Sequence, residues 1–188
     1  EDVARSNAIL ERLRSVAAQV AGSRTALGAL PMHAVAQVGG ARIGIVGDFC
    51  LDAYWHLDSA LSEPSIETGL ATRAVRDQRY SPGGAGNVAA NLVALGVGTV
   101  RAFGVLGDDP FGREMVRIFA AMGVDAAGML VQPTGWNTPV YVKPVEDGKE
   151  QNRIDFGNAN ALDPAIGERL LATLRAALPT LDLVIVNQ

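Results

Sequence analysis

The chain has 188 residues, of which 48% are hydrophobic and 19% charged, and its formal net charge at pH 7 is −4. This composition is ordinary for a globular α/β protein. The acidic balance, without a basic run, argues against nucleic acid or an anionic membrane as the main partner. A single cysteine, Cys50, excludes an internal disulfide and suits a reducing compartment. No segment resembles a membrane span or a signal peptide, so a cytoplasmic location is expected.

The first forty residues are predicted to form an extension. Apolar side chains recur at helical spacing over residues 6–21 and indicate an amphipathic helix. The stretch that follows is irregular, contains Pro31 and closes with Gly39-Gly40. We therefore expect residues 1–40 to be an N-terminal helical extension and residues 41–188 to be the domain proper.

Short apolar segments alternate with helical patterns through that domain. The predicted strands are 42–47, 99–105 and 181–186, and the predicted helices are 87–95, 111–122 and 163–178. Almost continuously apolar strands are typical of parallel sheets that are covered on both faces. The pattern predicts a three-layer α/β/α sheet of the doubly wound type. Because the last predicted strand ends close to Gln188, the sheet is expected to be incomplete.

Two segments do not fit the alternation. Residues 68–80 are polar and roughly alternating, and residues 138–154 flank Asp147-Gly148, a strong hairpin signal. Together they predict a small antiparallel β sheet with a polar face, formed by strands at about 68–80 and 138–155. Such a sheet is suited to act as a lid or as a homodimer surface.

The glycine-rich turn before the first helix of the domain supports three interpretations. Gly84-x-Gly86-x-x-Ala89 matches a dinucleotide-binding fingerprint, but that fingerprint follows a buried strand, whereas residues 76–82 are charged and end in proline. The turn could instead only start a helix. It could also let a sugar approach backbone N–H groups at the helix N-terminus. A zinc site or a Ser-His-Asp triad is not expected, because the two histidines, His33 and His56, lack partners at suitable spacing.

Several motifs in order resemble one family. Residues 83–89 (GGAGNVA), followed by a helix and by residues 107–112 (GDDPFG), are similar to the N-terminal signature of the ribokinase-like PfkB carbohydrate kinases. Residues 46–55 (VGDFCLDAYW) resemble the opening of heptose-7-phosphate kinases within it. The spacing from Gly96 to Gly107 is one residue longer than is usual in the signature.

The resemblance implies a substrate site for a sugar or sugar phosphate. Asp52 would accept hydrogen bonds from sugar hydroxyls, Gly83 and Gly84 would admit sugar oxygens to backbone N–H groups, and Asn87 would offer its amide. Asn87 also occupies the expected N-cap of the helix. Asp48 is a weaker candidate, which would orient the loop. Lys143 and Arg153 in the lid are candidates to pair with a substrate phosphate, although each could equally be a solvated surface charge.

The family's catalytic aspartate lies in a Gly-Ala-Gly-Asp turn, and this sequence contains no such motif. The resemblance therefore implies that ATP and Mg²⁺ serve a longer parent protein and bind this chain incompletely at most. We expect no catalytic residue and no metal ligand here, and an inactive, acceptor-binding portion of a carbohydrate kinase. The alternatives are an NAD(P)-binding domain of the Rossmann type and a non-catalytic sugar-binding module.

Overall fold

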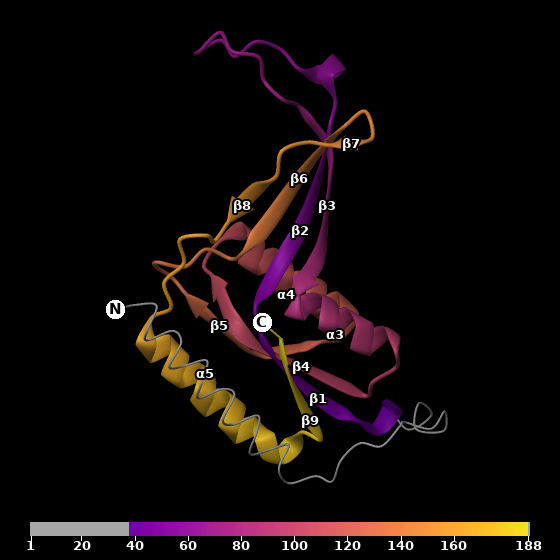
Figure 1. Cartoon of the computed structure of the whole chain (residues 1–188), viewed down its shortest axis with the longest axis vertical. Coiled ribbons are helices and arrows are strands. Elements are labelled where there is room, and N and C mark those ends of the chain that lie inside the picture. The colour runs from indigo at the N-terminus through magenta and orange to yellow at the C-terminus, as the bar shows by residue number, and fades with distance from the viewer. Residues whose placement is uncertain (1–37, 188) are drawn as a thin grey trace.

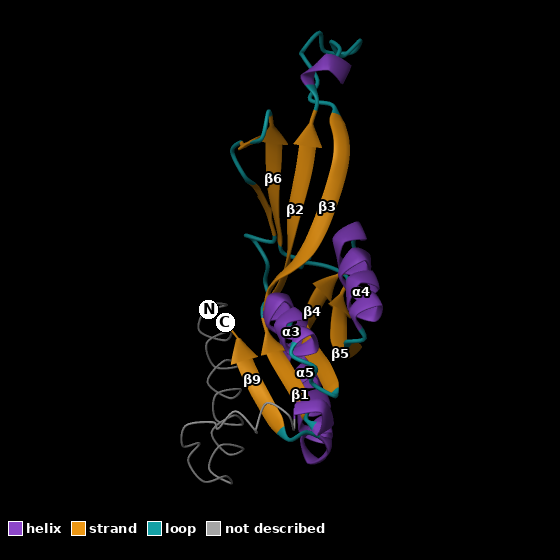
Figure 2. Ribbon diagram, turned by 90° about the vertical axis from the view of Figure 1, so that its right-hand side faces the viewer, coloured by secondary structure: helices purple, strands orange, loops and turns teal. Residues whose placement is uncertain are grey.

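The structure is a computed structural model that describes residues 38–187. Two β sheets are joined end to end in this part of the chain (Figure 1). Figure 2 shows the small sheet standing beyond one end of the main sheet, with a loop at its far tip. The helix expected over residues 6–21 lies outside the described residues.

The main sheet has four parallel strands in the order β5-β4-β1-β9. These are β1 (Arg42–Gly47), β4 (Thr99–Gly107), β5 (Asp125–Gln132) and β9 (Leu183–Asn187). The predicted strands are confirmed within two residues at each end, whereas β5 was missed. Its first half is Asp-Ala-Ala-Gly, residues with low strand propensity, so the sequence carries little local signal for it.

Helices cover both faces of the main sheet. They are α3 (Ala85–Ala94), α4 (Pro110–Met122) and α5 (Pro164–Ala177). In β1, Ile45 belongs to the core cluster that contains Phe119 of α4, whereas its neighbour Val46 belongs to the cluster that contains Leu171 of α5. Successive residues of a strand point to opposite faces, so α3 and α4 form one layer and α5 the other. The three-layer α/β/α architecture is confirmed.

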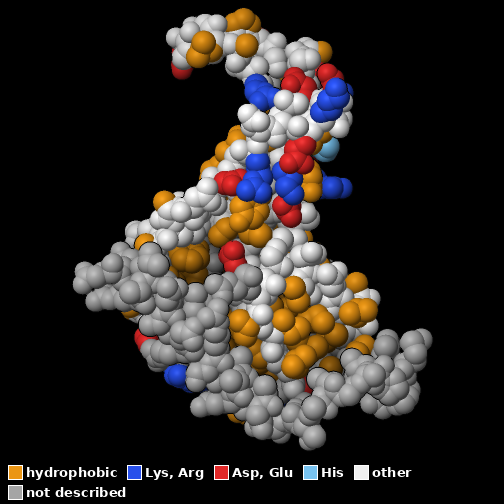
Figure 3. Space-filling view, viewed as in Figure 1, with side chains coloured by type: hydrophobic (Ala, Val, Ile, Leu, Met, Phe, Trp, Pro, Cys, Tyr) orange, Lys and Arg blue, Asp and Glu red, His pale blue; other side chains and the backbone are white. Residues whose placement is uncertain are grey.

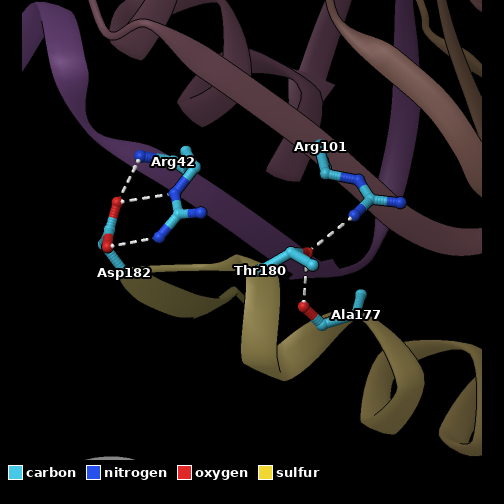
Figure 4. Close-up of polar contacts among 5 residues, drawn as sticks. All are labelled: Arg42, Arg101, Ala177, Thr180 and Asp182. Atoms are coloured by element: carbon cyan, nitrogen blue, oxygen red, sulfur yellow. Dashed lines mark hydrogen bonds and ion pairs between the residues drawn. The ribbon is translucent and has the colours of Figure 1, made fainter.

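Polar contacts fix the connection from α5 to β9 against the start of the sheet (Figure 4). Arg42 donates to Asp182 from its backbone N–H at 2.9 Å and from its guanidinium at 3.0 and 3.1 Å. Arg101 of β4 donates to the Thr180 hydroxyl at 3.2 Å, and that hydroxyl donates to the carbonyl of Ala177 at 2.7 Å. The turn that leads into β9 is therefore attached to both β1 and β4.

The small sheet is mixed, not antiparallel as predicted. Its order is β3-β2-β6-β7, with β8 also paired to β6. The strands are β2 (Phe49–Leu57), β3 (Val75–Gly84), β6 (Val140–Glu146), β7 (Lys149–Glu150) and β8 (Ile154–Phe156). β2 and β6 are parallel, and the other pairs are antiparallel. The sheet differs from the prediction because β2, which was not predicted as a strand, lies between the two predicted segments.

The predicted turn at Asp147-Gly148 connects β6 and β7, and both residues have positive φ, 49° and 74°. Positive φ at both central positions is the requirement of a type I′ hairpin. The prediction of a strand from residue 68 was wrong at its start. Residues 65–70 form a turn, in which Ser65 N–H donates to the carbonyl of Leu70 at 2.8 Å, and the strand begins at Val75.

One face of the small sheet is apolar and joins the main core. Leu51, Ala53 and Val142 are fully buried in the same cluster as Phe119. At the edge of this face, the ring of Phe111 in α4 lies 6.3 Å from Tyr80 and 5.2 Å from Phe156 between centroids. This packing attaches the small sheet to α4 and leaves its other face for polar residues.

Candidate functional site

Four of the predicted site residues lie where the two sheets meet, namely Asp48, Gly83, Gly84 and Asn87. β1 runs directly into Asp48 and then β2, and β3 ends at Gly83-Gly84, where α3 begins. The backbone carbonyl of Asp48 accepts from the N–H of Ala85 at 2.8 Å. The carboxyl end of β1, the base of the small sheet and the N-terminus of α3 therefore converge. In open α/β sheets ligands bind at the carboxyl ends of the strands.

The polar face of the small sheet is built from alternate residues of three strands. Asp52 of β2 is paired in register with Ser81 of β3 and Tyr141 of β6. The next residues outward on this face are Tyr54, Arg79 and Lys143, which are also paired in register. Figure 3 shows Lys, Arg, Asp and Glu side chains concentrated over the small sheet.

Asp52 forms an ion pair with Lys143 across the sheet. The Nζ atom of Lys143 lies 2.7 Å from Oδ1 of Asp52, and the two side chains are 19% and 28% exposed. Lys143 also donates to the hydroxyl of Tyr54 at 3.3 Å. The hydrogen bond to Asp52 is the main reason that the pKa of Lys143 is raised, against a smaller lowering by burial. Lys143 is thus a fixed, half-buried cation and not a solvated surface charge.

The glycine pair lies directly beside Asp52. A Cβ atom added to Gly83 would lie 2.8 Å from Sγ of Cys50 and 3.1 Å from Oδ2 of Asp52. Gly84 has a φ of 54°, and a Cβ there would lie 2.5 Å from the carbonyl oxygen of Asp48. Both positions therefore require glycine for close packing or for backbone conformation. Gly83 thus lies beside Asp52, and Gly84 lies beside Asp48.

Asn87 does not cap the helix, contrary to expectation. The N-cap is Gly84, and α3 begins at Ala85, which places Asn87 in the first turn with an exposed side chain. The helix starts two residues earlier than predicted, and its first two residues, Ala85 and Gly86, are buried. From this position the Asn87 amide stays available at the N-terminal end of the helix.

Cys50 and Asp48 complete this part of the site. Cys50 lies on the same face of β2 as Asp52 and is buried. Burial, followed by the nearby carboxylates of Asp48 and Asp52, raises the pKa of its thiol to about 11. The thiol is therefore protonated at neutral pH and is a packed side chain.

Arg153 lies on the polar face but is held by another partner. Its guanidinium donates to both carboxylate oxygens of Asp155, at 2.6 and 2.8 Å, and its Cζ lies 4.4 Å from the ring centroid of Tyr141. Its side chain is 49% exposed. Of the two predicted phosphate ligands, only Lys143 contacts Asp52.

A buried polar network joins the two sheets, and sequence reasoning gave it no role. The hydroxyl of Thr138, which is fully buried, accepts from Gly107 N–H at 3.0 Å. Asp109 accepts from Gly112 N–H at 2.7 Å, capping α4, and from Thr138 N–H at 2.7 Å. The segment that leads into β6 is thereby attached to the end of β4. The Gly-Asp-Asp motif was the available signal, because Asp109 precedes proline at the start of a helix.

Further polar bonds hold the neighbouring loops. Gln132, 3% exposed, donates to the carbonyl of Ala161 at 2.8 Å and accepts from Asp163 N–H at 3.0 Å. Asn160 accepts from Asn137 N–H at 2.8 Å and donates to the carbonyl of Asn137 at 2.7 Å. The loops after β5 and β8 therefore form one connected rim beside the base of β6.

Within residues 38–187, no group of three or more His, Cys, Asp or Glu side chains is arranged to hold a metal ion. In the same range no helix has both the length and the apolar character needed to span a membrane. The strand before the glycine turn, β3, is an exposed edge strand antiparallel to β2. The dinucleotide fingerprint requires a buried parallel strand at this position, so the arrangement does not fit it.

The described residues thus form an α/β/α sheet with a small lateral sheet, and a glycine turn lies beside an aspartate at their junction. Residues 52–187 match the pfkB family of carbohydrate kinases. The chain belongs to this family. The predicted family is confirmed over most of the described residues.

Curated relatives include bifunctional proteins named HldE and a D-beta-D-heptose 7-phosphate kinase. The chain is 32% identical over 158 residues to the bifunctional protein HldE of Mesorhizobium japonicum, covering 84% of this chain and 31% of that protein. It is 31% identical over 147 residues to the D-beta-D-heptose 7-phosphate kinase of Bordetella bronchiseptica, covering 78% of this chain and 45% of that protein. The chain thus spans less than half the length of either relative.

Solved structures agree on the fold. A carbohydrate kinase from Agrobacterium tumefaciens aligns with a TM-score of 0.50 at 20% identity, over 78% of this chain and 45% of that one. A microbiome-derived acarbose kinase aligns with a TM-score of 0.50 at 21% identity, over the same shares. At this identity the likeness shows the ribokinase-like fold alone.

Proposed function

We propose that this chain is the acceptor-binding portion of an ATP-dependent carbohydrate kinase. The parent protein would transfer the γ-phosphoryl group of ATP to a hydroxyl of a sugar or sugar phosphate. The observation that carries the proposal is the position of Asp52 beside the Gly83-Gly84 pair, at the carboxyl end of β1. A carboxylate accepts hydrogen bonds from vicinal hydroxyls, and glycine lets a ligand approach the backbone closely.

The residues have separate roles in this proposal. Oδ1 of Asp52 is engaged by Lys143 at 2.7 Å, so Oδ2 is the acceptor for the substrate. The amide of Asn87 and the backbone N–H groups at the start of α3 donate to other hydroxyls. Asp48 orients the loop through its backbone bond to Ala85. The small sheet acts as the lid, which excludes water before transfer.

The transfer step itself is assigned to the rest of the parent protein. A new P–O bond forms to the sugar oxygen as the bond to ADP breaks, and the hydroxyl proton passes to a base. The family's base lies in a Gly-Ala-Gly-Asp turn, which this sequence lacks. When bound, Mg²⁺ neutralises charge on the phosphates. We therefore expect the chain alone to be inactive, and ATP and Mg²⁺ to bind residues that it does not contain.

Three earlier expectations stay predictions. A homodimer formed through the small sheet is compatible with its exposed polar face, and a cytoplasmic location is compatible with the activity proposed. A non-catalytic sugar-binding module would use the same residues without transfer. Sequencing the gene beyond Gln188 separates this alternative from the kinase, because an in-frame Gly-Ala-Gly-Asp supports the kinase.

The direct test is a kinase assay on the parent protein with a panel of sugars and sugar phosphates. Asp52→Asn and Asn87→Ala should each raise KM or lower kcat/KM for the preferred substrate. Arg175→Ala, an exposed change on α5, serves as the control. Wild-type kinetics in both site variants would refute the assignment of the site.

A further inference from the structure

The two residues that lead into β6, Asn137 and Thr138, are bonded to segments far from them in the sequence. Thr138 N–H donates to Oδ2 of Asp109 at 2.7 Å, and the Thr138 hydroxyl accepts from Gly107 N–H at 3.0 Å. On the other side, the Asn160 side chain makes two hydrogen bonds to the Asn137 backbone, at 2.7 and 2.8 Å. We call these five residues the β6 clamp.

The β6 clamp is closely packed around two glycines. A Cβ atom on Gly107 would overlap Oδ2 of Asp109 and would lie 2.9 Å from the backbone nitrogen of Thr138. A Cβ atom on Gly112 would lie 2.9 Å from the hydroxyl oxygen of Thr138. Thr138 itself is fully buried. Because close-packed interiors resist displacement, the start of β6 is fixed relative to the end of β4 and the start of α4.

The β6 clamp is followed directly by the strand pairing that serves Asp52. The carbonyl of Pro139, the first residue after the clamp, accepts from Leu51 N–H at 2.9 Å. Two residues farther along, Tyr141 is paired in register with Asp52. From its own place in β6, the ammonium of Lys143 reaches Oδ1 of Asp52 at 2.7 Å. The position of β6 along its axis therefore decides whether Lys143 meets Asp52.

The apolar pattern of β6 does not fix that position by itself. β2 and β6 are parallel strands, so no hairpin turn sets their register. Val140 and Val142 are fully buried, and a slip of one residue would turn both to the polar face. A slip of two residues keeps both on the apolar face and moves Lys143 by about 6.6 Å along the strand. The β6 clamp opposes this second movement.

We infer that Asp109 is a positioning residue for the acceptor site, and that it acts through β6 without contact to the substrate. Its two carboxylate oxygens have separate tasks. Oδ1 accepts from Gly112 N–H at 2.7 Å and caps α4, whereas Oδ2 holds Thr138. By holding Thr138, Asp109 keeps Lys143 in contact with Asp52. This inference rests on the function proposed above and deepens it, because it adds a residue outside the site that sets the geometry of the site.

The variant Asp109→Asn separates the two tasks. Asparagine caps a helix as well as aspartate does, but its NH2 group donates and cannot accept from Thr138 N–H. The matched control is Asp163→Asn. Asp163 is also an N-cap followed by proline, and its side chain accepts from Ala165 N–H at 2.8 Å within its own helix, α5.

The first measurement is the double-mutant cycle of Asp52→Asn and Lys143→Met in the 188-residue chain, followed by urea unfolding. In the Asp109→Asn background the non-additivity of the two changes should fall by at least half, because the two side chains are no longer held in contact. In the Asp163→Asn background it should keep its wild-type value. A role of Asp109 in stability alone would shift the unfolding midpoint and leave the non-additivity unchanged.

The second measurement is sugar binding by titration calorimetry with the same chain. The probes are ribose, mannose and a heptose 7-phosphate, and the one that the wild type binds most tightly is used for the comparison. Asp109→Asn should weaken its binding roughly tenfold, as expected when one oriented hydrogen bond is lost. Asp163→Asn should bind it as the wild type does.

The non-additivity decides the inference. A wild-type value in the Asp109→Asn background would overturn it, and so would an equal fall in the Asp163→Asn background. If Asp109→Asn shows no cooperative thermal transition, Asp109→Ser, which also keeps a capping oxygen, takes its place in both measurements. A folded wild-type chain that binds none of the three probes would overturn the proposed function, whereas the double-mutant cycle would still support or refute the placement of Lys143 by Asp109.

Discussion

Replacing Asp52 by asparagine leaves the ammonium of Lys143 without its carboxylate partner. The remaining polar contact of Lys143 within the described residues is the Tyr54 hydroxyl at 3.3 Å. The two side chains are 28% and 19% exposed, which places the pair between a surface pair and a buried one. Surface pairs contribute about 0–1 kcal/mol, and losing one partner of a buried pair costs about 3–5 kcal/mol. We expect Asp52→Asn to lower the free energy of unfolding by about 1–2 kcal/mol.

A double-mutant cycle isolates the pair. Asp52→Asn, Lys143→Met and the double variant are compared by urea unfolding, followed by tryptophan fluorescence. The two changes should be non-additive by about 1 kcal/mol at pH 7. Because the pKa of Lys143 is raised in the folded state, this contribution is complete below the ordinary lysine pKa and is lost as pH rises through the folded value. Additive effects at pH 7 would show that the two side chains are not energetically coupled.

Three further predictions concern single residues of the described part of the chain. Thr138→Val leaves Gly107 N–H buried without its acceptor and should lower the free energy of unfolding in urea by about 1–3 kcal/mol. Thr138→Ser should retain most of the stability, and equal losses in the two variants would contradict the role of the hydroxyl. Cys50, with its thiol pKa raised to about 11, should react with iodoacetamide at pH 8 far more slowly than in 8 M urea, and equal rates would be contrary evidence. Gly148→Ala, at a φ of 74°, should lower the free energy of unfolding by about 1 kcal/mol. Gly40→Ala, where an added Cβ meets nothing within 4 Å, should not lower it.

Much of the main sheet could be predicted because its signals are local. Continuous apolar runs identified three of the four strands, and Asp163 before Pro164 located the start of α5 within one residue. β5 has no such signal, since its Ala-Ala-Gly start acquires strand conformation only by pairing with β4. Tertiary context decides such segments.

The small sheet shows a different reason for error. β2 alternates buried Leu51 and Ala53 with polar Asp52 and Tyr54, which is a clear strand pattern, but its place beside β6 depends on a pairing between segments far apart in the sequence. The parallel β2–β6 pair was therefore not predictable from either segment alone. Asp52 was identified as a site candidate from the resemblance, whereas its ion pair with Lys143 follows only from the register of the β2–β6 pair.

Binding of sugar to the chain without nucleotide tests the proposed acceptor site directly. The substrate that the parent protein phosphorylates best is titrated into the 188-residue chain, after a cooperative thermal transition has shown that the chain is folded. We predict binding at one site per chain, strongly weakened in Asp52→Asn. A folded wild-type chain that binds no sugar, or an Asp52→Asn variant that binds it as tightly as the wild type, would contradict the assignment of the acceptor site.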